Sequence, residues 1–153
     1  MILLREAVKG DLTLILSWRN NPDVYQGFYC QKSPITWDEH CNWWASRYNW
    51  KEFIVVLYED YIMRPIGVVT LGQLDHWSPE IGYYIGETSL WGKGYGREAV
   101  KEGMAWLKKH GYQYTHTTIL DKNKRSIRLI KSLGWEYLGI AREGESWYQV
   151  KLI

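Results

Sequence analysis

One segment of the sequence, from Glu80 to Leu120, combines strand and helix patterns in an order that restricts the fold. "EIGYYIG" and "THTTIL" are rich in β-forming residues, and between them "REAVKEGMAWLKKHG" places Val100, Met104 and Leu107 on one helical face. Gly111 follows this face directly and is a typical helix stop. A helix that separates two strands in this way predicts one crossover connection near the centre of a sheet.

The other segments predict hairpins and separate helices. Asp11 is a suitable N-cap for a helix over "LTLILSW", and Thr36, with Glu39 three residues later, has capping-box spacing at the start of "TWDEHCNWWAS". "ILLREAV" predicts a first strand, "EFIVVLY" and "PIGVVTL" a hairpin around "EDYIMR", and "WEYLGIA" and "SWYQVKLI" a last hairpin around "REGE". "NKRSIRLIKSLG" predicts a helix that stops at Gly134. The order predicts one α/β (α+β) domain with a mostly antiparallel sheet.

Composition excludes several classes of protein. The chain has 153 residues, a formal charge of +2 and no basic block, so neither nucleic acid nor a membrane surface is an expected partner. The N-terminal residues do not resemble a signal peptide, and no apolar run reaches the roughly 18 residues of a membrane span. We therefore expect a cytoplasmic protein. Cys30 and Cys41 fit no zinc or redox spacing, and no metal is expected. The 10 Trp and 12 Tyr residues exceed the needs of a core, which favours a concave site lined by aromatic rings.

The stretch "LWGKGYGREAV" places Gly92, Gly94 and Gly96 at alternate positions immediately before the central helix. The first turn of a helix has unpaired N–H groups and a partial positive charge, and both attract anions. Glycines let a phosphate approach these N–H groups without obstruction by Cβ atoms, and Lys93 and Arg97 add positive charge. The stretch therefore predicts a ligand that carries phosphate.

Three other interpretations of the glycines fit less well. A flexible loop whose last glycine lets the helix pack closely on the sheet needs only one glycine. A P-loop requires Ser or Thr after its lysine, whereas Gly94 follows Lys93. A dinucleotide fingerprint matches Gly94, Gly96 and Ala99, with Asp121 after the next strand, but "GETSLW" separates the glycines from the preceding strand.

Three motifs together resemble the GNAT family of acetyl-CoA-dependent N-acetyltransferases. "WGKGYG" is similar to the family loop [QR]-x-x-G-x-[GA], with Trp91 at the Gln/Arg position. "SPEIGYYIG" and "NKRSIRLIKSLGW" resemble a strand and a helix of the branch that includes ribosomal-protein-alanine acetyltransferases. The resemblance implies a twisted, mostly antiparallel sheet of about six to seven strands flanked by about four helices. It also implies a single N-acetyltransferase domain over residues 1–153, with acetyl-CoA as co-substrate.

The resemblance assigns site residues by position. Glu80 matches the usual general base, although a glutamate at a strand end is equally typical of a solvated surface; Asp75 and His76 are reserve candidates. Ile130 occupies the place of a tyrosine that protonates the thiolate in many members, which leaves Ser126 as a possible acid. The implied coenzyme contacts, including backbone donors on the strand, are Tyr84, Ile85, Trp91, Gly92, Lys93, Gly94, Tyr95, Gly96, Arg97, Asn123 and Ser126. Asn123 is also a suitable helix N-cap, and Ser126 could be a surface residue of the first turn.

The acceptor side is expected from the early helices. "WRN-x-P-D", followed by "W-x-E-H", resembles members that acetylate nucleotide-linked amino sugars, and the same region is shared with enzymes that acetylate protein N-termini. Trp18, Arg19 and Asn20 are the candidate contacts, although Asn-Asn-Pro also ends a helix and Trp18 could belong to the core. A small amine or antibiotic is a third possible acceptor, and a non-catalytic coenzyme A-binding module is the competing class. Either a monomer or a homodimer is compatible with the sequence, and Trp43, Trp44, Trp50 and Trp77 are further candidates for this side.

Overall fold

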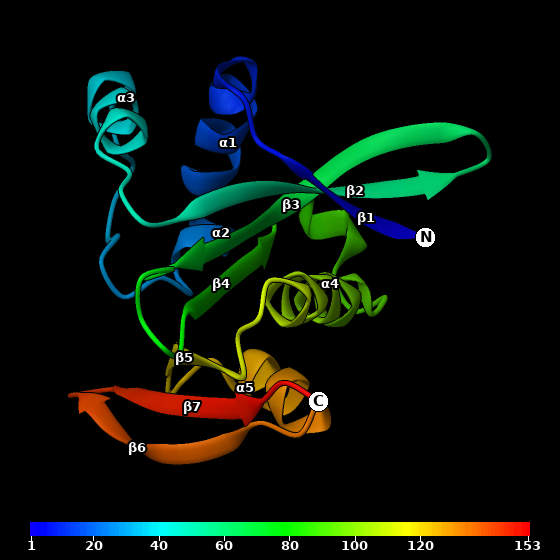
Figure 1. The fold of residues 1–153 in the computed structure, drawn as a ribbon. Helices are drawn as coiled ribbons and strands as arrows, with labels where there is room; N and C mark the ends of the chain where they lie inside the picture. The colour runs from blue at the N-terminus through cyan, green and yellow to red at the C-terminus, as the bar shows by residue number, and fades with distance from the viewer.

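The computed structural model describes all residues from Met1 to Ile153, and its centre is a seven-stranded sheet (Figure 1). The strand order is β1-β2-β3-β4-β5-β7-β6, and only the β4–β5 pair is parallel. The strands are β1 Ile2–Glu6, β2 Lys51–Glu59, β3 Ile62–Gly72, β4 Glu80–Ile85, β5 Tyr114–Leu120, β6 Glu136–Arg142 and β7 Glu145–Lys151. This mixed, mostly antiparallel sheet with one crossover confirms the predicted fold.

Five α-helices cover the two faces of the sheet. They are α1 Leu12–Arg19, α2 Pro22–Tyr25, α3 Trp37–Ala45, α4 Tyr95–Lys109 and α5 Lys124–Ser132. In Figure 1, α1, α2 and α3 lie together beyond β2, whereas α4 and α5 lie on the other side. Two short 3-10 turns, Lys9–Asp11 and Thr88–Leu90, precede α1 and the glycine loop.

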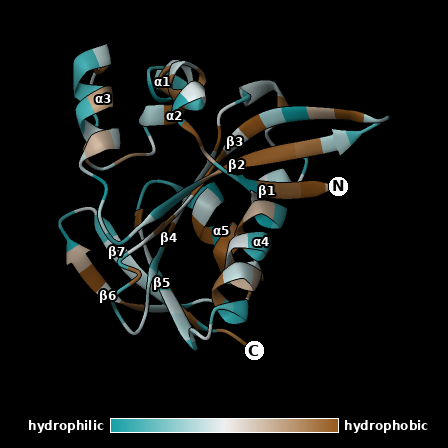
Figure 2. Cartoon of the chain, turned by 45° about the horizontal axis from the view of Figure 1, so that its top comes forward, coloured by the Kyte–Doolittle hydropathy of each residue, from teal (hydrophilic) through white to brown (hydrophobic).

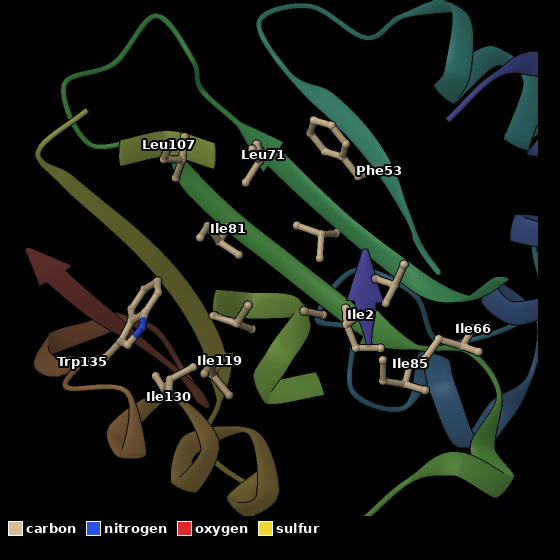
Figure 3. Close-up of a cluster of buried hydrophobic side chains, with 14 of the residues drawn as sticks. Ile2, Phe53, Ile66, Leu71, Ile81, Ile85, Leu107, Ile119, Ile130 and Trp135 are labelled. Carbon is tan, nitrogen blue, oxygen red and sulfur yellow. The ribbon is translucent and has the colours of Figure 1, made fainter. Parts of the chain in front are cut away.

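The core is divided by the sheet because successive strand residues point to opposite faces. On β2, Val55 belongs to the large cluster beneath α4 and α5, whereas Ile54 belongs to a smaller cluster beneath α1. Figure 3 shows the large cluster, in which Leu107 of α4 and Ile130 of α5 face the sheet residues Leu71, Ile81 and Ile119. In Figure 2, brown runs along β1, β2 and β3, while α4 alternates between teal and brown, as expected for an amphipathic helix.

The feature that positions the site is a split between β4 and β5. Glu80 and His116 form the only residue pair of the parallel ladder. Beyond this pair the two strands diverge, and the connection from β4 through the glycine loop and α4 returns to β5 on the far side of the split. The backbone polar groups of β4 past Ile81 are therefore left without a neighbouring strand on that side.

Local departures from the sequence-based expectations have physical causes. The hairpin turn is only Asp60 and Tyr61, both at positive φ, and β3 starts at Ile62, which was expected in the turn. Asp11 does precede α1, but its carboxylate binds the Arg5 guanidinium at 2.8 and 2.9 Å instead of capping the helix. Sequence analysis did not predict the short helix α2, because the proline in its first turn is equally typical of the end of the preceding helix. Its addition brings the helix count to five instead of four.

Candidate active site

A large cleft of about 1080 Å³ lies at the β4–β5 split, inside the sheet, and its lining residues come from both faces of the sheet. At one end it is lined by the glycine loop and by the first turns of α4 and α5. At the other end it is lined by α1, the segment after α2, and the polar faces of β2 and β3. The cleft thus has two halves, which we call the loop half and the helix half, that meet at β4.

The loop half presents unpaired backbone amides. Gly92 and Gly94 have φ values of 81° and 85°, in the left-handed region where glycine is favoured. No side chain caps α4, and none of the amides from Gly92 through Arg97 donates to another backbone group or to a side chain. These unpaired amides and the positive end of the α4 dipole are the features from which the sequence predicts an anion site.

Gly96 has a different role from the other two glycines. A Cβ atom placed there would lie 3.3 Å from Leu129 Cδ1 and 3.5 Å from Tyr83. Gly96 therefore allows the first turn of α4 to approach both α5 and β4 closely. The contact with β4 is the packing on the sheet that sequence analysis considered for the last glycine.

Cationic side chains around the loop half come mainly from α5. Arg97 donates to Ser132 Oγ at 3.1 Å, which ties α4 to the end of α5, while it still lines the cleft. Arg125 lies 4.9 Å from the centre of the Trp91 ring, and Arg128 and Lys122 also line the cleft. Lys93 is exposed and does not line it. The α5 cations were not expected, because their spacing alone is also that of a solvated helix face.

The side chains of Trp91 and Thr117 bind two backbone carbonyls of β4. Trp91 Nε1 donates to the carbonyl of Ile85 at 2.7 Å, and Thr117 Oγ1 donates to the carbonyl of Ile81 at 2.7 Å across the split. The amide of Gly86 donates to Ile66 of β3. By the alternation of a strand, the amide of Ile85 faces the split, whereas the amide of Tyr84 faces β3. Of the two expected backbone donors, only Ile85 is therefore placed toward the cleft.

Glu80 lies at the point where β4 and β5 separate. Its Oε2 is 3.6 Å from His116 Nε2, its side chain is 37% exposed, and it lines the cleft. His116 is buried, and its Nδ1 is 2.6 Å from the carbonyl of Ser78, so Nδ1 carries a proton and Nε2 faces Glu80. Asp75 and His76, the reserve candidates, do not line this cleft.

Ser126 is paired with a residue that sequence analysis missed. The Tyr83 hydroxyl lies 2.6 Å from Ser126 Oγ, and both residues line the cleft. Burial raises the pKa of the Tyr83 phenol, and the bond to Ser126 opposes that shift. Asn123 Oδ1 accepts from the Ser126 amide at 3.3 Å, so Asn123 caps α5 and also lines the cleft.

The three candidate acceptor residues of α1 and its end are separated by the fold. Arg19 lines the helix half, lies 4.8 Å from the Trp43 ring centre, and has its Nη1 3.2 Å from His40 Nδ1. Trp18 is 4% exposed, belongs to the core cluster of α1, and does not line the cleft. Asn20 is committed to both the amide and the carbonyl of Ile35. Trp18 therefore packs in the core, and Asn20 holds the backbone of Ile35. Neither side chain lines the cleft where an acceptor contact was expected.

Two of the four further tryptophans line the helix half. Trp43 and Trp50 are in its wall, with an edge-on contact between their rings at 6.2 Å. Trp44 lies under the Arg47 guanidinium, 3.3 Å from its ring centre, and Trp77 is exposed beside Tyr114. Neither Trp44 nor Trp77 lines the cleft.

A buried carboxylate in the helix half was not expected from the sequence. Glu52, at the start of β2, is only 3% exposed and accepts a bond from Thr70 Oγ1. Burial raises the pKa of Glu52 to about 7, against smaller opposing effects from Thr70 and the Arg47 and Arg19 guanidinium groups. In the sequence, Glu52 directly precedes an apolar run and resembles an exposed strand end. Its neighbours in the sequence therefore do not predict that its side chain is buried.

Two further observations concern metal binding and membrane spans, which sequence analysis considered from composition. The side chains of His, Cys, Asp and Glu nowhere gather in a group of three suited to a metal ion. None of the helices has both the length and the apolar character that a membrane crossing requires.

Comparison with known proteins identifies the family. The model of the acetyltransferase (GNAT) domain matches residues 1–136, which is most of the chain. The chain therefore belongs to the GNAT acetyltransferase domain family.

The relatives agree with this family at two levels of similarity. An uncharacterised protein of Methanocaldococcus jannaschii, MJ1062, is 44% identical over 151 residues, which span 99% of this chain but only 31% of that protein. The crystal structure of a domain from the same organism is also 44% identical, covers 99% of both chains and has a TM-score of 0.96. Spermidine N-acetyltransferase from Vibrio cholerae, solved with CoA and spermine, is 19% identical with a TM-score of 0.83 over 99% of this chain and 95% of that chain. At that identity the likeness shows the fold alone.

Proposed function

We propose that residues 1–153 form one acetyl-CoA-dependent N-acetyltransferase domain, working in the cytoplasm, that moves the acetyl group directly to a primary amine. One observation carries the proposal: the β4–β5 split opens into a cleft that joins the unpaired amides of Gly92–Arg97 to a separate half lined by polar and aromatic groups. A site with two halves that meet at the free edge of β4 suits two substrates bound at once.

The loop half fits the pyrophosphate of coenzyme A. The amides from Gly92 through Arg97 offer hydrogen bonds that no protein group uses, and Gly92 and Gly94 carry no Cβ that would obstruct an anion. Arg97 and Arg125 add positive charge on either side. Spermidine N-acetyltransferase and aminoglycoside acetyltransferase AAC(6')-Ib, which share the fold, were solved with coenzyme A, and this supports the assignment.

The chemistry requires a neutral amine, a polarised carbonyl and a proton for the departing thiolate. We propose that Glu80, directly or through water, removes one proton from the acceptor nitrogen. That nitrogen then bonds to the thioester carbonyl carbon, and as the carbon–sulfur bond breaks it loses its second proton to solvent, which leaves a neutral amide and a thiolate. The amide of Ile85 is oriented to stabilise charge on the carbonyl oxygen. The Ser126 hydroxyl, supplied with a proton by Tyr83 at 2.6 Å, is the proposed donor to the thiolate, and Tyr83 regains its proton from solvent.

The acceptor that the helix half favours is a small-molecule amine. Trp43 and Trp50 offer apolar ring faces suited to a sugar or base, and the Arg19 guanidinium suits a phosphate or carboxylate. Amino-sugar nucleotides combine these features, and a protein N-terminus is the second candidate. The structural neighbours act on spermidine and aminoglycosides, which supports small amines as a class.

The test is release of free coenzyme A thiol from acetyl-CoA with four amines: a UDP-linked amino sugar, spermidine, kanamycin and a peptide with a free N-terminus. We expect at least one amine, with the amino sugar first, to raise thiol release well above hydrolysis. Acetyl-CoA should bind with a Kd in the micromolar range, about −8 kcal/mol. Binding of acetyl-CoA without thiol release for any amine would favour the non-catalytic coenzyme A-binding module instead. Absence of binding would refute both.

A further inference from the structure

Buried polar atoms without a hydrogen-bond partner are concentrated in the helix half of the cleft. The chain has five such side-chain atoms. Four of them belong to residues that line the cleft: Gln31 Oε1, Trp50 Nε1, Glu52 Oε2 and Tyr84 Oη. Because buried polar groups are nearly always paired, a set of unpaired ones in one place indicates that a ligand supplies the missing partners.

Glu52 is the member of this set for which a missing partner is most costly. Its Oε1 accepts from Thr70 Oγ1, while Oε2 has no partner. The sheet register places Glu52 opposite Thr70 and Thr70 opposite Gly82, so the three residues form a row on one face of β2, β3 and β4. Since Gly82 has no side chain, this face of β4 beside Thr70 stays open to the cleft.

The charged and titratable groups around Glu52 do not neutralise it. Arg19 of α1 contacts His40 and the Trp43 ring, and Arg47, just after α3, donates to the Trp44 carbonyl and stacks on its ring. None of the six ion pairs of the structure includes Glu52. Tyr84 of β4 is the third titratable neighbour, and burial together with the charge of Glu52 raises the pKa of its phenol.

We infer that Glu52 binds the cationic nitrogen of the acceptor through Oε2 and so determines which amines the enzyme accepts. This inference rests on the proposed function. A carboxylate oxygen that is buried and unpaired is best satisfied by a group that both donates a hydrogen bond and carries positive charge, which describes an ammonium ion. Glu52 thus holds the nitrogen beside Gly82, and Glu80, further along the same strand face, takes the proton.

The pKa of Glu52 gives this binding a pH dependence. With a pKa of about 7, much of the carboxyl is protonated at neutral pH in the free enzyme. An ammonium group binds only the ionised form, so apparent acceptor affinity rises with pH through about 7. The neighbours Arg19 and Arg47 lower this pKa and Tyr84 does not titrate in that range, so this pH dependence of acceptor binding is assigned to Glu52.

The test compares Glu52→Gln with Asp11→Asn, a control at a carboxylate outside the cleft. Asp11 is also buried, at 9% exposed, but its carboxylate is already paired with the Arg5 guanidinium at 2.8 Å. With the best acceptor of the four amines, we expect Glu52→Gln to raise the acceptor KM roughly tenfold or more, with kcat changed less than about threefold. The rise of acceptor affinity through about pH 7 should disappear and the Kd for acetyl-CoA should stay unchanged. Asp11→Asn should match the parent in acceptor KM, in this pH dependence and in coenzyme binding.

A second measurement does not depend on turnover. Saturating spermidine, kanamycin, the UDP-linked amino sugar and the peptide are each added to both variants and to the parent at about pH 8, where Glu52 is ionised, and thermal unfolding is followed. At least one amine should raise the Tm of the parent and of Asp11→Asn, and this rise should be lost in Glu52→Gln. An equal rise in Glu52→Gln, or a fall in kcat with an unchanged acceptor KM, would overturn the assignment. A parent Tm that none of the four amines changes would also overturn the assignment. Acetyl-CoA binding with none of these amine effects leaves the coenzyme half of the proposed function standing.

Discussion

Gly94→Val is expected to raise the Kd for acetyl-CoA by roughly 100-fold or more while the protein remains folded. Gly94 has φ 85° and is the N-cap residue of α4, and β-branched residues strongly disfavour that backbone conformation. Relief of the strain rotates the peptide units that carry the Gly94 and Tyr95 amides. Loss of two hydrogen bonds to a charged pyrophosphate, each worth about 1.5 kcal/mol, accounts for the factor. Isothermal titration calorimetry measures it.

Gly111→Val is the matched control for that change. Gly111 follows the other end of the same helix, at φ 91°, and a Cβ at either glycine meets nothing within 4 Å. The two variants should therefore lose similar amounts of thermal stability, but only Gly94→Val should lose coenzyme binding. If both bind acetyl-CoA as the parent does, the glycine loop has only a structural role.

Glu80→Gln is expected to lower kcat by roughly 100-fold with little change in the Kd for acetyl-CoA. The amide preserves the shape of the side chain and can donate to His116 Nε2, which now lies 3.6 Å from the carboxylate, but it cannot accept a proton from the acceptor. Because the change acts on the chemical step, kcat and kcat/KM should fall together. Steady-state thiol release with a saturating amine gives both constants.

Asp75→Asn serves as the comparison for Glu80. Asp75 is the nearby carboxylate that the sequence offered as a reserve, and it lies outside the large cleft. Turnover in Asp75→Asn should match the parent. A loss of turnover there, together with full activity in Glu80→Gln, would transfer the role of the base to Asp75.

The parts of the fold that could be predicted from the sequence are those with local causes. The α4 face of Val100 and Leu107, both fully buried, follows from helical spacing, and the stop at Gly111 follows from its positive φ. The Thr36 side-chain oxygen accepts a hydrogen bond from the Glu39 amide, as its spacing indicates. The unpaired amides of the glycine loop are also a local feature, because they follow from glycines at the start of a helix without a side-chain cap.

The parts of the site that could not be predicted depend on contacts between distant segments. Glu52 is buried because β1, β3 and the helices of one face enclose its strand, and nothing adjacent in the sequence indicates this. The bond from Tyr83 to Ser126 joins β4 to α5 across 43 residues. Trp18 was expected at the acceptor, yet Gly86, whose Cβ would lie 2.2 Å from the Trp18 ring, leaves space for the ring in the core. In each case tertiary packing decides the role of a residue whose type alone fits either a core or a site.

The central claim is that the unpaired amides before α4 hold the pyrophosphate of coenzyme A. A crystal structure with coenzyme A bound tests it most directly. We predict that the pyrophosphate oxygens lie within hydrogen-bond distance of amides in the segment Gly92–Arg97, with the thiol end of the molecule in the β4–β5 split. A pyrophosphate held at any other surface, with that segment left free, would contradict the account.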